Sequence, residues 1–495
     1  MELKITGKTF EYMDAVFSGV QETEKTAEKI VPDSFEDVAE IICADAVPLL
    51  RSKDAYEGRV SVSGIAEINA ICRLENGKAA ALSLEAPLDF TAEAPGVSEN
   101  GAVIASLNTL SVTAQLLNPR KISVTVKAAA DIAVFEKRSV TVPDTVPDEI
   151  EARLRTEDYI LPEGAFENTF SVSGEASAHG AADIGEIISV RTRLGCDEKK
   201  AVGSKLIVRG TAAAEVVYLP SGGGAPECAD FTVPFSQVVD AGENAEERSF
   251  SVTSAVTGIA VSRSETSGLP NVEISAVLQC VSFSKASFTY ISDAYSPEYA
   301  LDAQYETLCL YTGDGAAETT GTLRGTISSA GAEKVLSVSA LCPSQAEAGD
   351  GRVFADISLR ALCVCGGELK CLSGTFTAEA PYSGCAENAR VQVSVPREIY
   401  ALPSSQSVDF RTQAVFNAEC ISRPCIRYLA GVQSGEEVTR KDAPSVVLYR
   451  VCGGETLWDM GKKWRTHPSA IAEANGLDAD AAPETGRLLI IPAGA

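Results

Sequence analysis

The chain has 495 residues, more than one hydrophobic core usually supports, so we expect several domains. Hydrophobic residues make up 45% of it and charged residues 22%, which excludes disorder along the whole chain. The formal net charge of -26 argues against nucleic acid as a partner, because phosphate backbones are bound by clustered Lys and Arg.

The first residues, Met1 to Phe17, lack the basic start and apolar run of a secretory signal. No run of the sequence approaches the roughly 18 apolar residues that span a bilayer, so we expect no membrane insertion. The fourteen cysteines are predicted to be reduced thiols, packed as small hydrophobic side chains. The spacing of Cys363, Cys365 and Cys371 departs from the usual zinc pattern, which favours core packing over a metal site.

An internal repeat begins near residue 37. DVAEII at 37–42 corresponds to DIGEII at 183–188, and Gly64 corresponds to Gly210 at the same shift of 146 residues. Two landmarks that keep one spacing indicate a duplicated unit.

A third, diverged copy is indicated by GRVFADISLRALCVC at 351–365, which matches GRVSVSGIAEINAIC at 58–72. Ala330 and Ile357 stand at its two landmark positions. Both a packed and a strung-out arrangement of the three copies are compatible with the sequence.

Within each copy apolar residues alternate with polar ones, as in KISVTV at 121–126. Half-buried strands of this kind, separated by Gly, Pro and Asn, predict a mainly β fold of tandem antiparallel sandwich-like or barrel-like repeats. PDSFEDVAEII at 32–42 is the exception. Ser34 followed by Asp37 is similar to a capping box, and it predicts one or two helical turns there. Gly185 predicts that this helix is shorter or absent in the second copy.

No repeat contains a recognisable catalytic constellation. His179 stands alone in ASAHGAAD, and pairs of carboxylates carry little information in so acidic a chain. SGGG at 221–224 lacks a following Lys-Ser/Thr, so it is interpreted as a hairpin loop and not a phosphate cradle. We therefore predict a protein without enzymatic activity, bound metal or cofactor.

The last fifty residues have a different pattern. Val447, Tyr449 and Val451 predict a short strand, which a Gly-Gly turn follows. Thr456 is placed to cap a helix whose buried face includes Met460. A second helix is predicted after His467-Pro468, ending at Asn475-Gly476, and RLLIIP at 487–492 predicts a returning strand. The expected unit is βααβ.

This unit resembles the LysM domain. The family pattern is met by eleven residues: Tyr449, Val451, Gly454, Thr456, Leu457, Trp458, Asn475, Leu477, Gly486, Leu489 and Pro492. Two departures are Glu455 in place of the usual Asp, and Met460-Gly461 in place of Ile-Ala.

The resemblance implies binding of N-acetylglucosamine polymers, in peptidoglycan or chitin, in a groove between two loops. One wall would be Gly454, Glu455, Thr456 and Leu457, and the other Asn475, Gly476 and Leu477. The same residues also suit purely structural roles as cap, helix end and core. A LysM domain that docks a protein is instead expected to expose an apolar patch, with Trp464 or Met460 in it.

The repeats resemble the SPOCS domain, also called DUF3794. IVPDSFEDVAEIICADA from Ile30, GRVSVSGIAEINAI from Gly58 and LNPRKISVTV from Leu117 carry this resemblance, which is strongest in the first copy and least in the third. It implies a protein of endospore-forming bacteria, made in the mother-cell cytoplasm and assembled at the forespore surface beneath the coat. The LysM partner would then be a coat morphogenetic protein or cortex peptidoglycan.

The expected organisation is a lead-in at 1–29, repeats at 30–140, 160–295 and 318–430, a linker at 431–445 and the LysM domain at 446–493. The leading hypothesis is a non-catalytic scaffold of the spore envelope. The alternative is a peptidoglycan-binding cell-wall protein whose repeats form a stalk. A LysM-targeted hydrolase is disfavoured, because no segment supplies a nucleophile, a base and a pocket signature.

Overall fold

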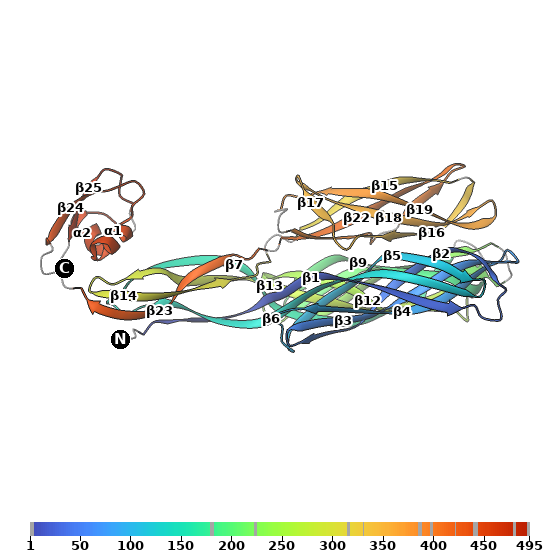
Figure 1. Ribbon diagram of the computed structural model, residues 1–495, viewed down its shortest axis with the longest axis horizontal. Coiled ribbons are helices and arrows are strands. Elements are labelled where there is room, and N and C mark those ends of the chain that lie inside the picture. Colours follow the sequence, from blue (N-terminus) through green and yellow to red (C-terminus); the bar gives the residue numbers. More distant parts are fainter. Residues whose placement is uncertain are drawn as a thin grey trace.

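The computed structural model describes residues 4–178, 183–221, 225–313, 317–329, 331–384, 389–396, 399–420, 422–438, 444–478 and 482–492. Strands account for 75% of the chain and helices for 4%, so the predicted mainly β fold is confirmed. The strands form three two-sheet sandwiches, a stalk and a small terminal domain (Figure 1).

The first sandwich packs a β2-β3-β4 sheet on a β1-β6-β5 sheet. Every pairing is antiparallel, and the inward residues of alternating strands, such as Val60, Val62 and Val124, are fully buried in the shared core. The strands are β1 (Thr6–Ile30), β2 (Val38–Tyr56), β3 (Arg59–Leu74), β4 (Ala79–Glu93), β5 (Ala102–Asn118) and β6 (Lys121–Thr145).

The second sandwich has sheets of order β8-β11-β10-β9 and β12-β13-β7. It consists of β7 (Glu151–Glu175), β8 (Ser177–Ala178), β9 (Ile184–Val202), β10 (Lys205–Pro220), β11 (Glu227–Asp240), η1 (Ala245–Glu247), β12 (Ser249–Arg263) and β13 (Pro270–Tyr295).

The third sandwich pairs β15-β22-β20 with β16-β18-β17, and β19 and β21 join at the sheet edges. It consists of β15 (Ala317–Ser328), β16 (Ala332–Leu341), β17 (Glu347–Gly349), β18 (Arg352–Cys365), β19 (Glu368–Pro381), β20 (Ala389–Ser394), β21 (Tyr400–Pro403) and β22 (Ser407–Cys420). Cys363 and Cys365 lie in its core, where core packing was predicted for them. His179 and Ala330 lie outside the described residues, as does Gly222–Gly224 of the predicted hairpin loop.

Two predictions for the N-terminal region differ from the structure. The segment at 1–29, expected to be a lead-in, contributes β1, which pairs with β6 along its whole length. The helical turns predicted at 32–42 are wrong, because the chain makes a turn near Ser34 and is extended from Val38 onward. There Val38 donates its N–H to the Pro119 carbonyl, and the β-branched Ile41 pairs opposite Cys72.

Both landmark positions of the repeat have structural roles. Asp37 forms an ion pair with Arg120, which ties the start of β2 to the connection between β5 and β6. Asp183 forms one with Arg263, which ties the start of β9 to the end of β12. At Gly64 and Gly210 a Cβ atom would collide with a backbone carbonyl of the neighbouring strand. Glycine is therefore needed at both positions for close approach of the strands.

The three sandwiches lie together at one end of the molecule (Figure 1), and their mutual contacts close into a ring, which we call the head. β3 and β4 contact β9, β10 and β11 contact β16, and β19 contacts β2. In each contact a strand equivalent to β4 (β4, β11 or β19) meets a strand equivalent to β2 in the next copy (β9, β16 or β2). The head therefore has approximate three-fold symmetry.

Residues at one repeat position meet at the centre of the head. Arg191 donates to Asp45 and, at 2.7 Å, to Ser337, and the three residues are spaced 146 apart in the chain. Arg360 also lies 3.6 Å from Asp45. Burial opposes ionisation of Asp45, but Arg191 and Arg360 outweigh it and lower the pKa of this carboxyl. Ile71, Val217 and Val364 pack nearby in a common apolar cluster.

Three ribbons extend from the head and form a stalk. The ribbons are the outer parts of β1 with β6 and β7 with β13, together with β14 (Tyr299–Cys309) paired to β23 (Cys425–Glu437). They pack around a shared core that includes Leu161, Phe288 and Tyr428. Because β1, β6 and β7 have 25 residues each, single strands run unbroken from the head into the stalk.

The third ribbon is covalently closed at its base. Cys309 and Cys425 are directly opposite in the β14–β23 register and form a disulfide. The prediction that all cysteines are free thiols is therefore wrong for this pair. The pairing could not be seen in the sequence, because 116 residues separate the two cysteines. The ten other cysteines of the described ranges for which a state is assigned are free.

The terminal domain has the predicted βααβ order, with β24 (Val446–Arg450), α1 (Leu457–Trp464), α2 (Pro468–Asn475) and β25 (Leu488–Pro492). It lies at the end of the stalk, on the far side from the head (Figure 1). β24 and β25 form a two-stranded antiparallel sheet, and the helices cover one face of it.

Candidate functional site

The first helix of the terminal domain starts at the predicted cap. The Thr456 hydroxyl accepts the Asp459 N–H at 3.3 Å, and the Asp459 carboxylate accepts the Thr456 N–H at 2.9 Å, which completes a capping box. The backbone N–H and the hydroxyl of Thr456 lower the pKa of Asp459. A structural role for Thr456 is thus evident without any ligand.

Asn475 ends the second helix and holds the returning strand. Its amide nitrogen donates to the carbonyls of Ile471 and Ile490, both at 2.7 Å, and its amide oxygen accepts the Ile490 N–H at 2.8 Å. Gly476 then takes the left-handed conformation, with φ of 59°, at the helix end. The Asn475 side chain is therefore engaged within the domain itself.

Glu455, which departs from the usual Asp, closes the loop between β24 and α1. Its carboxylate accepts the Cys452 N–H at 2.9 Å and the Tyr449 hydroxyl at 2.8 Å. These two hydrogen bonds lower the pKa of Glu455, so this wall of the predicted groove is anionic at neutral pH. Lys463 donates to the same Tyr449 hydroxyl at 3.1 Å, which places one cation beside the loop.

The predicted groove residues divide into two groups. Leu457 is 1% exposed and Leu477 is partly buried, and both pack in the core of the domain. Gly454 and Gly476 are exposed, and Glu455, Thr456 and Asn475 are half-buried. Leu457 is thus closed to a ligand, whereas the second group and part of Leu477 are accessible, and their role in binding stays a prediction.

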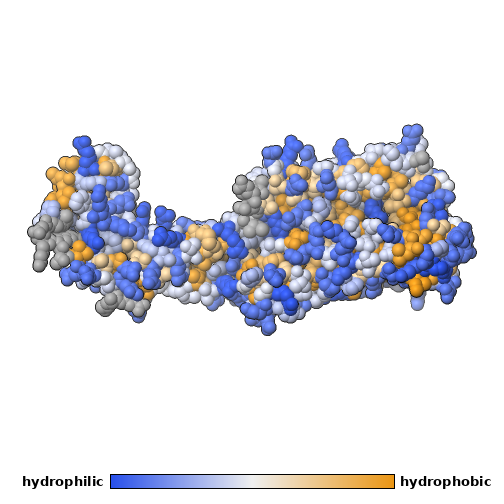
Figure 2. Space-filling model, viewed as in Figure 1, coloured by the Kyte–Doolittle hydropathy of each residue, from blue (hydrophilic) through white to orange (hydrophobic). Residues whose placement is uncertain are grey.

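Met460 and Trp464 do not form the exposed apolar patch that was predicted for protein docking. Met460 is fully buried, and Trp464 packs against the same core cluster. The exposed apolar residues of the domain lie instead on the outer face of its sheet, where Figure 2 shows apolar surface over β24 and β25.

One side of α1 is occupied by the stalk. Trp458 donates its indole N–H to Asp293 at 3.0 Å, Lys462 contacts the same carboxylate at 2.6 Å, and Tyr295 donates to the Thr466 carbonyl at 2.7 Å. The Tyr295 and Trp458 rings meet edge to face with centroids 4.9 Å apart. His467 also contacts Glu151 of the stalk.

Asp293 is the centre of this contact. Burial opposes its ionisation, but hydrogen bonds from Lys462 and Trp458 outweigh burial and lower the pKa of the carboxyl. Sequence reasoning missed this contact, since more than 160 residues separate Asp293 from Trp458 and no local pattern marks either as a contact residue.

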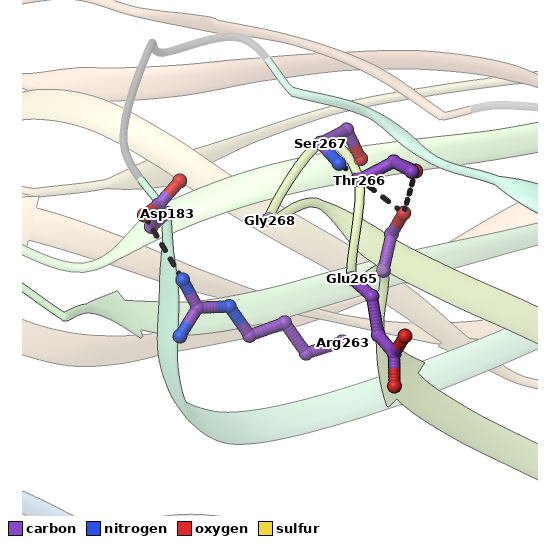
Figure 3. Close-up of a pocket in the computed structure, with 7 residues that line it drawn as sticks. Asp183, Arg263, Glu265, Thr266, Ser267 and Gly268 are labelled. Atoms are coloured by element: carbon purple, nitrogen blue, oxygen red, sulfur yellow. Dashed lines mark hydrogen bonds and ion pairs between the residues drawn. The ribbon is translucent and has the colours of Figure 1, made fainter.

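A shallow polar hollow lies at the β12–β13 connection (Figure 3). Arg263 and Asp183 form an ion pair across it at 3.0 Å, and Ser264 and Thr266 share a hydrogen bond at 3.1 Å. Both members of the ion pair are more than half exposed. The charges of Arg263 and Asp183 neutralise each other. The hollow therefore has the features of a loop stabilised by an ion pair and not of a catalytic site.

No group of metal-ligating side chains occurs in the described ranges. Within the same ranges no helix is long and apolar enough to cross a bilayer. The terminal domain is nearly neutral, with five Lys and Arg against six Asp and Glu in residues 446–492, whereas the chain as a whole carries -26. Most of the negative charge therefore belongs to the head and the stalk.

Comparison with known protein families agrees with this architecture. Residues 183–262 match the family described as SipL, SPOCS domain, and residues 449–492 match the LysM domain. Neither the curated proteins nor the solved structures contain a match to the chain. The SPOCS match covers strands β9 to β12 of the second sandwich, and the LysM match covers nearly all of the βααβ unit. The chain thus combines a SPOCS domain with a LysM domain that follows it.

Proposed function

We propose that this protein is a non-catalytic assembly scaffold of the bacterial spore envelope. It would act in the mother-cell cytoplasm at the forespore surface, with the LysM domain docking onto a coat morphogenetic protein or cortex peptidoglycan. The SPOCS match supports a role associated with sporulation, and the LysM match supports a binding role.

The observation that carries this proposal is the position of the LysM domain. It lies at the end of a stalk of three ribbons, away from the head, with Gly454 and Gly476 of its two loops exposed. Such a placement lets one end of the molecule reach a partner while the head contacts another layer. The near-neutral charge of the domain reduces repulsion from anionic surfaces.

A second candidate is a cell-wall protein that binds peptidoglycan. The exposed loop residues and the anionic Glu455 beside Lys463 supply hydrogen-bonding groups of the kind that sugar hydroxyls require. In this alternative the head and stalk would only hold the LysM domain away from other structures.

The first experiment measures co-sedimentation of the full chain with insoluble purified peptidoglycan and titrates the same protein with soluble chitin oligomers. Glu455→Ala removes the acceptor that closes the loop, and Glu473→Ala, on the exposed side of α2, is the matched control. Saturable binding that falls at least fivefold in Glu455→Ala alone supports glycan as the ligand. Absence of binding by the folded protein favours a protein partner.

A fluorescent fusion of the full chain, expressed in a sporulating host, tests the location. The scaffold proposal expects a signal that encircles the forespore before the coat matures. A signal spread evenly through the mother cell, or confined to the wall of vegetative cells, contradicts it.

A further inference from the structure

The outer face of the LysM sheet is strongly apolar. Val446 and Leu448 on β24 and Leu488 and Ile490 on β25 are between 41% and 65% exposed. In the register Leu448 pairs with Ile490 and Val446 with Pro492, so these side chains form one continuous patch, the outer sheet face. The inward residues of the same strands, such as Leu489 and Ile491, are fully buried under the helices.

This apolar surface is separate from the two regions described above. The stalk contact uses α1 and the start of α2, and the predicted glycan groove uses the loops. A sugar on the outer sheet face would leave most of its hydroxyls unpaired, because Arg450 is the one charged side chain that the alternation of β24 and β25 places there. The face is therefore suited to an apolar partner and not to a glycan.

The area of the face limits the size of the partner. Four partly exposed aliphatic side chains present on the order of 400 Å², about half of the roughly 800 Å² per partner of a standard interface. Face-to-face packing of two copies would bury too little for a stable dimer. It would also bring together two chains that each carry -26. A second copy is thus disfavoured by area and by charge.

A single helix fits the dimensions of the face. Five-residue strands are about 13 Å long, and two strands together are about as wide as one α-helix of about 10 Å diameter. Two to three helical turns would cover the patch. The sheet already has helices on its inner face, so an outer helix would complete a three-layer arrangement of a common kind.

Arg450 adds a requirement for charge. It is exposed at the edge of the patch, opposite Leu488, and its guanidinium makes no ion pair within the described residues. A carboxylate on the partner could form a bidentate pair with it.

We propose that the outer sheet face docks an amphipathic α-helix of a partner protein, with an apolar stripe over Leu448 and Leu488 and an acidic residue facing Arg450. The inference deepens the proposed function and rests on it, since it names the surface and the chemistry by which the LysM domain would engage an envelope protein. A helix docked in this way would leave the two loops of the predicted glycan groove free.

The test uses the full chain with a photo-cross-linking amino acid, p-benzoylphenylalanine, at position 448 in sporulating cells. The same amino acid at position 402 is the control, since Leu402 is 71% exposed on the head. The cross-linked peptide is identified by mass spectrometry and then synthesised. A peptide specific to position 448 that is helical, has an apolar stripe and carries an acidic residue supports the inference.

The synthetic peptide is then titrated against purified variants. Leu448→Thr with Leu488→Thr keeps strand propensity while removing apolar area, and we expect at least tenfold weaker binding. Arg450→Glu should weaken binding similarly, and a Lys in place of the acidic residue of the peptide should restore it. Leu402→Thr should leave the affinity unchanged. Unchanged thermal unfolding of each variant establishes that the domain is intact.

Three cross-linking results would overturn the inference: a cross-link to a second copy of this chain, a cross-link to glycan, or no cross-link specific to position 448. If the variant with Leu448→Thr and Leu488→Thr still encircles the forespore as the wild type does, the inference is contradicted as well, while the proposed function stands. A wild-type protein that is absent from the forespore removes the proposed function itself.

Discussion

Two contacts hold the parts of this molecule together, and they differ in construction. At the centre of the head, Arg191 and Asp45 are about nine-tenths buried and lie beside the apolar cluster of Ile71, Val217 and Val364. At the end of the stalk, Lys462 and Asp293 form an ion pair whose side chains are 48% and 29% exposed, beside one aromatic pair.

The sandwiches of the head are fixed to one another more firmly than the LysM domain is fixed to the stalk. A buried charge that loses its partner is strongly destabilising, whereas exposed ion pairs contribute little because water screens them. The three sandwiches should therefore behave as one cooperative body. The LysM domain should separate from the stalk without unfolding of the head.

The largest effect is expected for Arg191→Ala. This change leaves Asp45 buried with the more distant Arg360 and the Ser339 hydroxyl, and we expect a loss of about 3–5 kcal/mol in the free energy of unfolding of the head. Urea unfolding followed by circular dichroism measures it. Arg352→Ala is the control, since both side chains of its pair with Glu379 are 62% exposed. A loss below about 1 kcal/mol would show that the central pair does not hold the ring together.

A medium effect is expected for Asp293→Ala, which removes the acceptor of Trp458 and the partner of Lys462. We expect docking of the LysM domain to weaken by about 1–2 kcal/mol after allowance for solvent screening, with the head unaffected. Hydrogen–deuterium exchange of residues 290–300 and 457–468 measures it, and Asp302→Ala on the exposed side of the stalk is the control. Equal protection in both variants would contradict the assignment.

The same carboxylate makes docking dependent on pH. Its pKa is lower in the docked state than in the free one, so its contribution is fully present above the ordinary aspartate range near pH 4 and is lost as the pH falls through the lowered value. The protection factors of the amides at 457–468, which correct for the pH dependence of intrinsic exchange, should thus fall in acid in the wild type. The Asp293→Ala variant should lack this pH-dependent loss of protection.

The smallest effect is expected for Thr456→Ala. Loss of the cap of α1 should destabilise the LysM domain by about 1 kcal/mol and leave the head and stalk unchanged. Exchange of the amides of α1 reports the change, and Thr485→Ala, at an exposed turn, is the matched control. If glycan affinity fell in Thr456→Ala while α1 kept its protection, Thr456 would be a ligand contact in addition to a cap.

Much of the architecture could be predicted from the sequence. The repeat spacing of Asp37 and Asp183 predicted a duplicated β unit, and the βααβ order with Thr456 as cap is confirmed. Local patterns sufficed because caps, turns and alternation depend on neighbouring residues. The helix predicted from Ser34 was wrong, since strand pairing with β3 overrides a local capping signal.

The contacts between distant parts could not be predicted. Asp45, Arg191 and Ser337 occupy one repeat position, yet their side chains differ in kind, so only the ring geometry shows that they interact. The Cys309–Cys425 disulfide and the Asp293–Lys462 pair likewise depend on a register and on packing that no local pattern encodes. Within the candidate site, the burial of Leu457 followed from the fold, whereas the pattern allowed both core and groove.

The unbroken strands of the stalk have a mechanical consequence. A pull on the LysM domain along the long axis of the molecule would reach the stalk through β23, which precedes the domain in the chain, and through the contact with β13. It would load β14 with β23 and β7 with β13 in shear, so that many inter-strand hydrogen bonds would share the force at once. The small contact around Asp293 has no such sharing and would part first. The molecule therefore combines a stalk that resists extension with a coupling at its end that yields first.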